Sequence, residues 1–347
     1  MFKHNRYFVL VCISVLIFLS ISISPIVSGK YENLKDTQND VKPFRLQGVR
    51  GVIEHLEFSP DNQLLVSATD IANTISVWSL AQKKKVKEVK IAQRIMKVAF
   101  SGDNQSVLFC LGNGKIGDFN IKAGKVTYWK GINNHPVTFA LNAARDKMLV
   151  GYRNAVEVRN LKTGRQEVSL PMPKANIMCV NWAMDDSHCV IATVGGSVSL
   201  WNIKTKMLVK QFGDNSLPED SFPKSIYLVS ENKEICCCFV VDYVLHWDSM
   251  TGELIGKIKK GKVGVRFLCS CYDAKHNTLL VSKDYEETLK FVDLTKRKQT
   301  NVLPLHHRAS SVAISSNSKR IAVGYGSHYL GVTDEVNSGI IDVFPRP

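Results

Sequence analysis

The fold class that this sequence predicts is all-β: a ring of seven four-stranded sheets, a seven-bladed β-propeller closed by the N-terminal strand. Three observations in the 347-residue chain predict it. A short alternating segment recurs at a nearly constant interval, a two-strand hairpin precedes the copies, and one unmatched strand stands before the first hairpin. A period of about 40–45 residues is typical of propeller blades.

The recurring segment alternates apolar and polar residues, which is the period-2 pattern of a half-buried strand. Its copies read TISVWSL, KIGDFNI, AVEVRNL, SVSLWNI, YVLHWDS, TLKFVDL and IIDVFP. One residue of each copy serves as an anchor for alignment, and successive anchors are 41, 40, 42, 46, 45 and 52 residues apart. The anchors are Trp78, Phe119, Arg159, Trp201, Trp247, Val292 and Phe344. This spacing predicts one copy in each of seven blades.

A hairpin lies about 20 residues before each anchor. The clearest is HLEFSPDNQLLVS at residues 55–67, with counterparts at 97–109, 179–191 and 312–323. In each, two apolar strands flank a turn rich in Ser, Pro, Gly, Asp and Asn. After most anchors a second turn follows, as in NIKAGK, NLKTGR and SMTGEL, and then an outermost strand. Each repeat therefore contains four strands.

The last repeat has no outer strand of its own, because the chain ends just after the anchor segment at residues 340–345. A spare strand, KPFRLQ at residues 42–47, precedes the first hairpin. We expect this N-terminal strand to complete the last blade, since such pairing hides a free sheet edge and locks the ring.

Residues 1–29 have the pattern of a targeting segment. Lys3 and Arg6 precede an apolar run at residues 8–24, Pro25 ends the run, and small residues lead up to Gly29. This order predicts a secretory signal cleaved near Gly29 and an exported protein, periplasmic or secreted. The alternative is an uncleaved membrane anchor, because residues 7–27 are long enough to span a bilayer.

The rest of the chain divides simply. Residues 30–41 are polar and aperiodic and are expected to form a linker, whereas residues 42–347 are expected to form the propeller as one domain. The composition, 45% hydrophobic and 22% charged, argues against a disordered, collagen-like or multi-span membrane protein.

Catalytic signatures are absent from the sequence. It contains no His-Glu-x-x-His, no Gly-x-Ser-x-Gly and no glycine-rich loop ending in Gly-Lys-Ser/Thr. We therefore expect a protein that is not an enzyme and that needs no cofactor. The alternative is an exported propeller enzyme or cofactor-binding propeller, with acids, histidines or a metal converging at the channel mouth.

The cysteines fall on predicted strands, except for one in the N-terminal segment. Free cysteine behaves as a small buried hydrophobe, so a core role is favoured. A disulfide is a second interpretation, although the hairpin register places Cys189 opposite Trp182 rather than Cys179. A metal site at Cys269 and Cys271 is a third, and it is disfavoured because no second pair of ligands follows.

The string FSPDNQLLVSATDIANTISVWSL at residues 58–80 is close to the pattern of the WD-repeat family of β-propellers, which the chain resembles over residues 42–347. The family's Trp-Asp pair occurs only as Trp247-Asp248, and its Gly-His pair is absent. Asp70 is one of three residues, with Asp242 and Asp284, that fall where the family has a turn aspartate. The resemblance implies a non-catalytic scaffold that binds a protein or peptide through one face and the rim.

Basic residues cluster after three anchors, where turns between third and fourth strands are expected to lie on one face. A positive arc there would bind an acidic protein or an anionic membrane surface. Lysines that only protect sheet edges are the alternative. The candidate binding residues are Lys83, Lys84, Lys85, Lys87, Lys259, Lys260, Lys296, Arg297 and Lys298.

A long loop at residues 327–338, SHYLGVTDEVNS, lies between the expected second and third strands of the last blade. Long loops on a rigid scaffold are candidate binding sites, although a tolerated insertion is the alternative. Its candidate residues are His328, Tyr329, Asp334 and Glu335. Nucleic acid is not expected as a partner, because no stacking aromatics interleave with the basic residues. The ring itself is expected to be monomeric.

Overall fold

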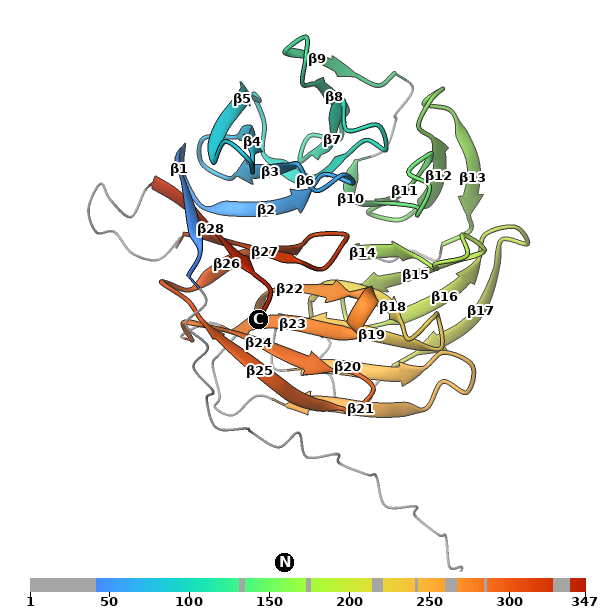
Figure 1. Cartoon of the computed structure of the whole chain (residues 1–347). Helices are drawn as coiled ribbons and strands as arrows, with labels where there is room; N and C mark the ends of the chain where they lie inside the picture. Colours follow the sequence, from blue (N-terminus) through green and yellow to red (C-terminus); the bar gives the residue numbers. More distant parts are fainter. Residues whose placement is uncertain are drawn as a thin grey trace, which may run out of the picture.

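Strands are the main regular element of the structure, a computed structural model that describes residues 42–130, 135–172, 176–213, 221–240, 243–259, 267–283, 286–326 and 338–347. Over these residues it has 28 strands and one short 3₁₀ helix, η1 (Ala274–His276). The strands form seven four-stranded antiparallel sheets, which follow one another in chain order from blue to red (Figure 1). Residues 1–41, with the predicted signal segment and linker, lie outside the described residues.

The first three blades use twelve consecutive strands, given from the innermost to the outermost. Blade 1 contains β2 (Ile53–Phe58), β3 (Leu64–Thr69), β4 (Thr74–Ser79) and β5 (Lys84–Lys90). Blade 2 contains β6 (Ile95–Phe100), β7 (Ser106–Leu111), β8 (Ile116–Asn120) and β9 (Lys125–Tyr128). Blade 3 contains β10 (Pro136–Leu141), β11 (Lys147–Tyr152), β12 (Val156–Asn160) and β13 (Gln166–Leu170).

The next three blades repeat this order. Blade 4 contains β14 (Ile177–Trp182), β15 (His188–Thr193), β16 (Val198–Asn202) and β17 (Met207–Phe212). Blade 5 contains β18 (Pro223–Val229), β19 (Glu234–Phe239), β20 (Tyr243–Asp248) and β21 (Leu254–Lys259). Blade 6 contains β22 (Phe267–Asp273), β23 (Thr278–Lys283), β24 (Thr288–Asp293) and β25 (Lys298–Pro304).

Blade 7 joins the two ends of the described chain. It contains β26 (Ala309–Ile314), β27 (Arg320–Tyr325), β28 (Ser338–Pro345) and, as its outermost strand, β1 (Phe44–Arg50). In Figure 1 the blue β1 lies along the red β28, and the first strands of blades 7 and 1 are in contact. The predicted seven-bladed ring and its closure by the N-terminal strand are confirmed.

The closing strand is held by charge as well as by its backbone. The Arg45 guanidinium makes two hydrogen bonds with the Asp342 carboxylate, from Nε at 2.7 Å and from Nη2 at 2.9 Å. The Asp342 side chain is only 1% exposed, so this bidentate pair neutralises a buried charge. Leu46 and Val49 of the same strand are buried.

The core is divided into seven apolar layers, each between two neighbouring blades. The layer between blades 1 and 2, for example, joins Val77 of β4 to Phe100 of β6, and the layer between blades 7 and 1 joins Val343 to Trp78. The other five layers have the same arrangement. Because side chains alternate along a strand, each blade contributes one side to the layer before it and the other side to the layer after it.

All seven anchors lie on the third strand of their blade and are buried. Trp78 also donates its indole N–H to the Ser67 hydroxyl at 2.9 Å, so its polar atom is satisfied inside the sheet. Asp70 accepts a hydrogen bond from the backbone N–H of Val52 at 2.9 Å. Asp242 and Asp284 lie outside the described residues.

The cysteines belong to these layers. All eight cysteines in the described part of the chain are free thiols, and seven of them are buried. Cys189 pairs with Trp182 across the β14–β15 hairpin, as the sequence register predicted. Burial raises the pKa of Cys110 and of Cys269 to about 12, so these thiols stay protonated and unreactive at neutral pH.

His55 gives the ring a dependence on pH. Burial on β2, together with the positive charges of Lys97 and Lys224, lowers the pKa of His55 from 6.5 to about 3. The unfolded chain therefore binds a proton between pH 6.5 and about 3 that the folded chain does not bind. Stability contributed by neutral His55 is present above pH 6.5 and is lost on acidification, by up to about 1.4 kcal/mol per pH unit.

We expect His55→Gln to flatten the acid limb of the stability curve. Urea unfolding of the wild type and the variant at pH 7, 6, 5 and 4 measures this, with exposed His306→Gln as the control. The difference in unfolding free energy between wild type and His55→Gln should shift in favour of the variant as pH falls. A difference that stays constant over this range would contradict the prediction.

Candidate functional site

The turns of each blade gather on two faces of the ring. In blade 1 the backbone N–H of Leu80, just after the third strand, donates to the Gln63 carbonyl, just before the second strand, at 3.0 Å. The equivalent bond occurs in all seven blades, ending with Arg346 N–H to the Lys319 carbonyl at 2.9 Å. The turn between first and second strands therefore lies beside the outer turn, between third and fourth strands. We call the face that carries both the turn face.

The six outer turns share one local conformation. The side-chain oxygen of the first residue of each turn accepts a hydrogen bond from the backbone N–H of the fourth residue. In blade 2, for example, the N–H of Ala123 donates to Oδ1 of Asn120 at 2.8 Å. The fifth residue has a positive φ in every turn: Lys83, Gly124, Gly164, Lys206, Gly252 and Arg297. An Asn, Asp or Ser that bonds the backbone ahead of it is the usual start of such a turn, which explains why these sequences fold this way locally.

The structure brings two of the predicted basic clusters to the turn face. Lys83 and Lys84 follow β4, and Lys296, Arg297 and Lys298 follow β24. All five are exposed. The blade 1 and blade 6 clusters therefore lie where the sequence predicted.

Four predicted binding residues also have structural contacts. The ammonium of Lys83 lies 5.2 Å from the ring centroid of Phe44 on the closing strand, and that of Lys296 pairs with Asp293 at 3.5 Å. The other two are Lys85 and Arg297. The ammonium of Lys85 donates to the Gly48 carbonyl of the closing strand at 2.7 Å and pairs with Glu88. The guanidinium of Arg297 donates to the Ile255 carbonyl in blade 5 at 2.9 Å. These two side chains link an outer turn to the preceding blade, so they are less free than Lys84 to meet a partner.

The prediction for the fifth blade is wrong. Lys259 is the last residue of β21 and pairs with Tyr243, the first residue of β20. It therefore lies at the opposite end of the blade from the outer turn, which is formed by residues 249–253. The error arose because the lysines follow the anchor by a whole strand rather than by a turn. Lys87 lies in the middle of β5, opposite Val77, and Lys260 lies outside the described residues.

Sequence reasoning missed six exposed cations that lie in the outer turns of blades 2, 3 and 4 or at the first residue of the strand that follows. They are Lys122, Lys125, Lys162, Arg165, Lys204 and Lys206. Their signal was present, since they occupy the same phase after the anchors as the clusters that were counted. Together with the blade 1 and blade 6 clusters they form what we call the basic rim. Blade 5 interrupts it, because its outer turn carries Asp248 and Glu253.

The other predicted binding region is the long loop of blade 7. His328, Tyr329, Asp334 and Glu335 lie outside the described residues. The strands that flank this loop, β27 and β28, are the second and third strands of the blade, as predicted.

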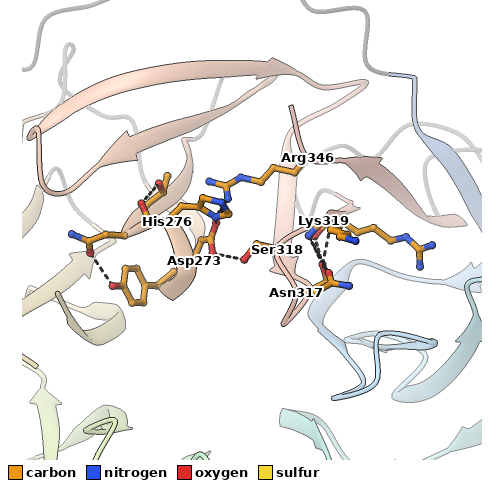
Figure 2. Close-up of polar contacts among 11 residues, drawn as sticks. Asp273, His276, Asn317, Ser318, Lys319 and Arg346 are labelled. Atoms are coloured by element: carbon orange, nitrogen blue, oxygen red, sulfur yellow. Dashed lines mark hydrogen bonds and ion pairs between the residues drawn. The ribbon is translucent and has the colours of Figure 1, made fainter. Parts of the chain in front are cut away.

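A polar cluster on the turn face joins blades 6 and 7. The Asp273 carboxylate, 1% exposed, accepts a hydrogen bond from the Ser318 hydroxyl at 2.6 Å and pairs with His276 at 2.8 Å. Arg346, directly after β28, pairs with the same carboxylate. Figure 2 shows these three side chains converging on Asp273. The C-terminal end of the last strand is thereby tied to the neighbouring blade.

This cluster has residue types found in hydrolases but not their geometry. In a catalytic triad the imidazole lies between hydroxyl and carboxylate, where it can take the hydroxyl proton. Here the carboxylate of Asp273 lies between Ser318 and His276 (Figure 2). The arrangement therefore acts as a clasp between blades.

We expect Asp273→Asn to destabilise the fold by about 2–4 kcal/mol, because the neutral amide leaves the Arg346 charge without its buried partner. The midpoint of urea unfolding measures the loss. Asp103→Asn is the matched control, since Asp103 accepts bonds only from Ser101 and Gln105 within its own turn, and it should cost less than about 1 kcal/mol. Equal losses in the two variants would contradict the clasp.

The described residues show neither a metal site nor a membrane-spanning helix. No three His, Cys, Asp or Glu side chains of that part of the chain come together so as to hold a metal ion. No helix within it has the length and hydropathy to cross a bilayer.

No protein-family model matches the chain. A curated relative, the WD repeat-containing protein AAC3 of Dictyostelium discoideum, is 23% identical over 201 residues. The match covers 54% of this chain and 39% of the relative, so the chain spans well under half of that protein. The seven four-stranded blades agree with the resemblance to WD-repeat propellers at residues 58–80. The chain is a seven-bladed β-propeller that is similar in sequence to a WD-repeat protein.

Proposed function

We propose that this chain is an exported, non-catalytic scaffold that binds an acidic protein surface through its basic rim. The observation that carries the proposal is that five of the six outer turns, each counted with the first residue of the strand that follows, present two or three cations on one face. Similarity to a WD-repeat protein supports an interaction role. Charges of one sign, spaced round a rigid ring, would steer and orient a partner of opposite sign.

Backbone conformation supports a role for these cations. The fifth residue of each outer turn has a positive φ, where glycine is favoured. Lys83 (φ 51°), Lys206 (φ 59°) and Arg297 (φ 52°) hold that position in three of the turns. A non-glycine residue there costs on the order of 1 kcal/mol. An acidic partner gives a physical reason for a cation at a site where stability alone favours glycine.

Edge protection does not account for the whole rim. Lysines on an outer strand discourage pairing with other chains, and Lys87 on β5 fits that role. Lys122 and Lys206, however, lie in turns and not on strand edges. A turn has no ladder of backbone hydrogen bonds that would need protection. The turn cations therefore need another explanation, and binding is the one that we propose.

The rim is tested by removing charge from turns and not from strands. The variant carries Lys83→Gly, Lys122→Ser and Lys206→Gly, which should leave stability within about 1 kcal/mol because glycine suits the two positive-φ positions. The probe is fluorescently labelled poly-glutamate, with binding followed by polarisation at low and physiological salt. We expect binding to weaken by about tenfold or more and its salt dependence to decrease.

The control removes the same number of charges from the opposite face. Lys90, Lys115 and Arg153 are exposed and lie at the strand ends and turns away from the turn face, and the control replaces all three by Ser. Its binding should stay within about twofold of the wild type. Equal weakening in both variants would mean that overall charge, not the rim, attracts the probe. Binding to anionic vesicles but not to poly-glutamate would assign the rim to a membrane.

Export is the second part of the proposal. It rests on the charged, apolar and small-residue order of residues 1–29. Eight strand cysteines stand against export, because oxidising compartments select against idle thiols. Seven of the eight are buried, and burial raises the pKa of thiols such as Cys179 and Cys189 to about 12, so these thiols react slowly.

Cell fractionation with intact-mass measurement tests export in the source cells. We expect the mature protein to lack about 29 residues and to occur outside the cytoplasm. A full-length mass in the membrane fraction would instead support a tether formed by residues 7–27. A full-length protein in the cytoplasm would contradict both.

A further inference from the structure

A pocket of about 640 Å³ opens at the outer turn of blade 3. Part of its wall comes from blade 2, because Trp129 and Lys130 follow the outermost strand of that blade. The rest comes from blade 3: Arg159, Leu161, Lys162, Thr163, Gly164, Arg165 and Gln166. We call this cavity the Arg159 pocket.

The lining carries positive charge without an acidic residue. Four cations, Lys130, Arg159, Lys162 and Arg165, line the pocket. Among the described residues, the carboxylate that pairs with a lining cation is that of Glu157, which is buried and pairs with Arg159 at 2.8 Å. The three exposed cations, Lys130, Lys162 and Arg165, have no ion pair with another residue in the described part of the chain, which suits a ligand with two negative charges.

Arg159 is the unusual residue of the pocket. It occupies the anchor position that holds a buried aromatic or aliphatic side chain in the other six blades, and it is itself only 5% exposed. Its Nε donates to Glu157 at 3.0 Å and lies 3.2 Å from the Tyr152 hydroxyl. Its Nη1 donates to the Gly164 carbonyl at 3.1 Å. The guanidinium is thus fixed before any ligand arrives.

Donors remain on this fixed guanidinium. An arginine carries five N–H groups, of which Nη1 and Nη2 hold two each. Each of these nitrogens has one partner among the described residues, the Gly164 carbonyl and the Glu157 carboxylate respectively. One N–H on each is left, and a pair of N–H groups on one guanidinium matches two oxygens of a phosphate.

Trp129 supplies an aromatic wall. Its ring is partly buried and packs against the layer between blades 2 and 3. The tight turn at Gly164 brings the blade 3 backbone close to it, since a Cβ on Gly164 would lie 3.9 Å from the ring. A planar group beside a fixed guanidinium favours a ligand that has its own flat ring next to its charge.

We propose that the Arg159 pocket binds a phosphate monoester carried on a planar ring. The phosphate would contact Arg159 and the turn cations Lys162 and Arg165, and the ring would lie against Trp129. This proposal goes beyond the proposed function of the rim. The rim would bind an extended acidic protein surface, whereas the Arg159 pocket would bind one small ligand at one defined site. The source of the phosphate is either a phosphorylated aromatic side chain or a mononucleotide, and both share this chemistry.

Calorimetric titration of the full chain with three probes tests the chemistry. The probes are inorganic phosphate, phenyl phosphate and adenosine monophosphate. We expect one-to-one binding of phenyl phosphate, tighter than that of inorganic phosphate. Tighter binding of the nucleotide than of phenyl phosphate assigns the site to nucleotides, and the reverse order assigns it to phosphorylated aromatic side chains. No saturable binding of any probe up to ~10 mM would overturn the proposal.

Matched variants locate the binding. Lys162→Ser with Arg165→Ser should weaken phenyl phosphate binding by about tenfold or more, because each loses a charge-assisted contact. Lys204→Ser with Lys206→Gly removes two charges from the blade 4 outer turn and should change binding by less than about twofold. These four positions are exposed, so folding is not at risk. An equal loss of phenyl phosphate affinity in the two double variants would overturn the proposal, because it would mean that the overall positive charge of the rim attracts the probe.

A third variant tests the aromatic wall. Trp129→Leu should reduce the preference for phenyl phosphate over inorganic phosphate while inorganic phosphate binding stays within about twofold. An unchanged preference would remove Trp129 from the site and leave no reason for a planar ligand. The rim variant with Lys83, Lys122 and Lys206 replaced should bind phenyl phosphate normally, which keeps this result separate from the test of the rim.

Discussion

The pairing of β1 with β28 is the constraint on which the rest of the structure depends. Every apolar layer lies between two blades, so a blade buries both of its sides only when it has a neighbour on each. Strand β1 brings Arg45 onto buried Asp342 and adds Leu46 to the layer between blades 7 and 1. It also covers the edge of β28, which would otherwise offer unpaired backbone groups to other chains. Closure of the ring therefore gives every blade a neighbour on both sides, so that all seven apolar layers are buried.

Closure and repetition together decide where chemistry can occur. Because each blade uses both sides for packing, only turns, outer edges and the ring axis can present polar groups freely. The repeated turn conformation then places equivalent residues at equivalent points round one face. A modest excess of lysine in one phase of the repeat becomes a rim of positive charge, although no two of its clusters are close in sequence.

Two buried polar residues, Arg159 and Asp273, and half-buried His55 mark places where packing alone does not explain the choice of side chain. Arg159 stands where other blades have an apolar anchor, Asp273 stands where Ser59 and Ser315 occupy the same turn position, and His55 is held neutral on an inner strand. Arg159 and Asp273 each have a partner of opposite charge, Glu157 and Arg346 respectively. For Asp273 the result is a clasp between blades, and for Arg159 it is a fixed guanidinium at the base of a pocket.

The period of the anchors, the alternation within strands and the spare strand before the first hairpin determined the seven-bladed ring, because these patterns reflect local backbone geometry and burial. Local pattern also placed Lys83 and Lys296 in outer turns. It misplaced Lys259, because the sequence pattern did not show that this lysine lies at the far end of the outermost strand and not in the turn before it. Tertiary structure alone decided that Trp129 lies beside Gly164, and that Arg346 reaches Asp273 some 70 residues away, because such contacts depend on how neighbouring blades pack.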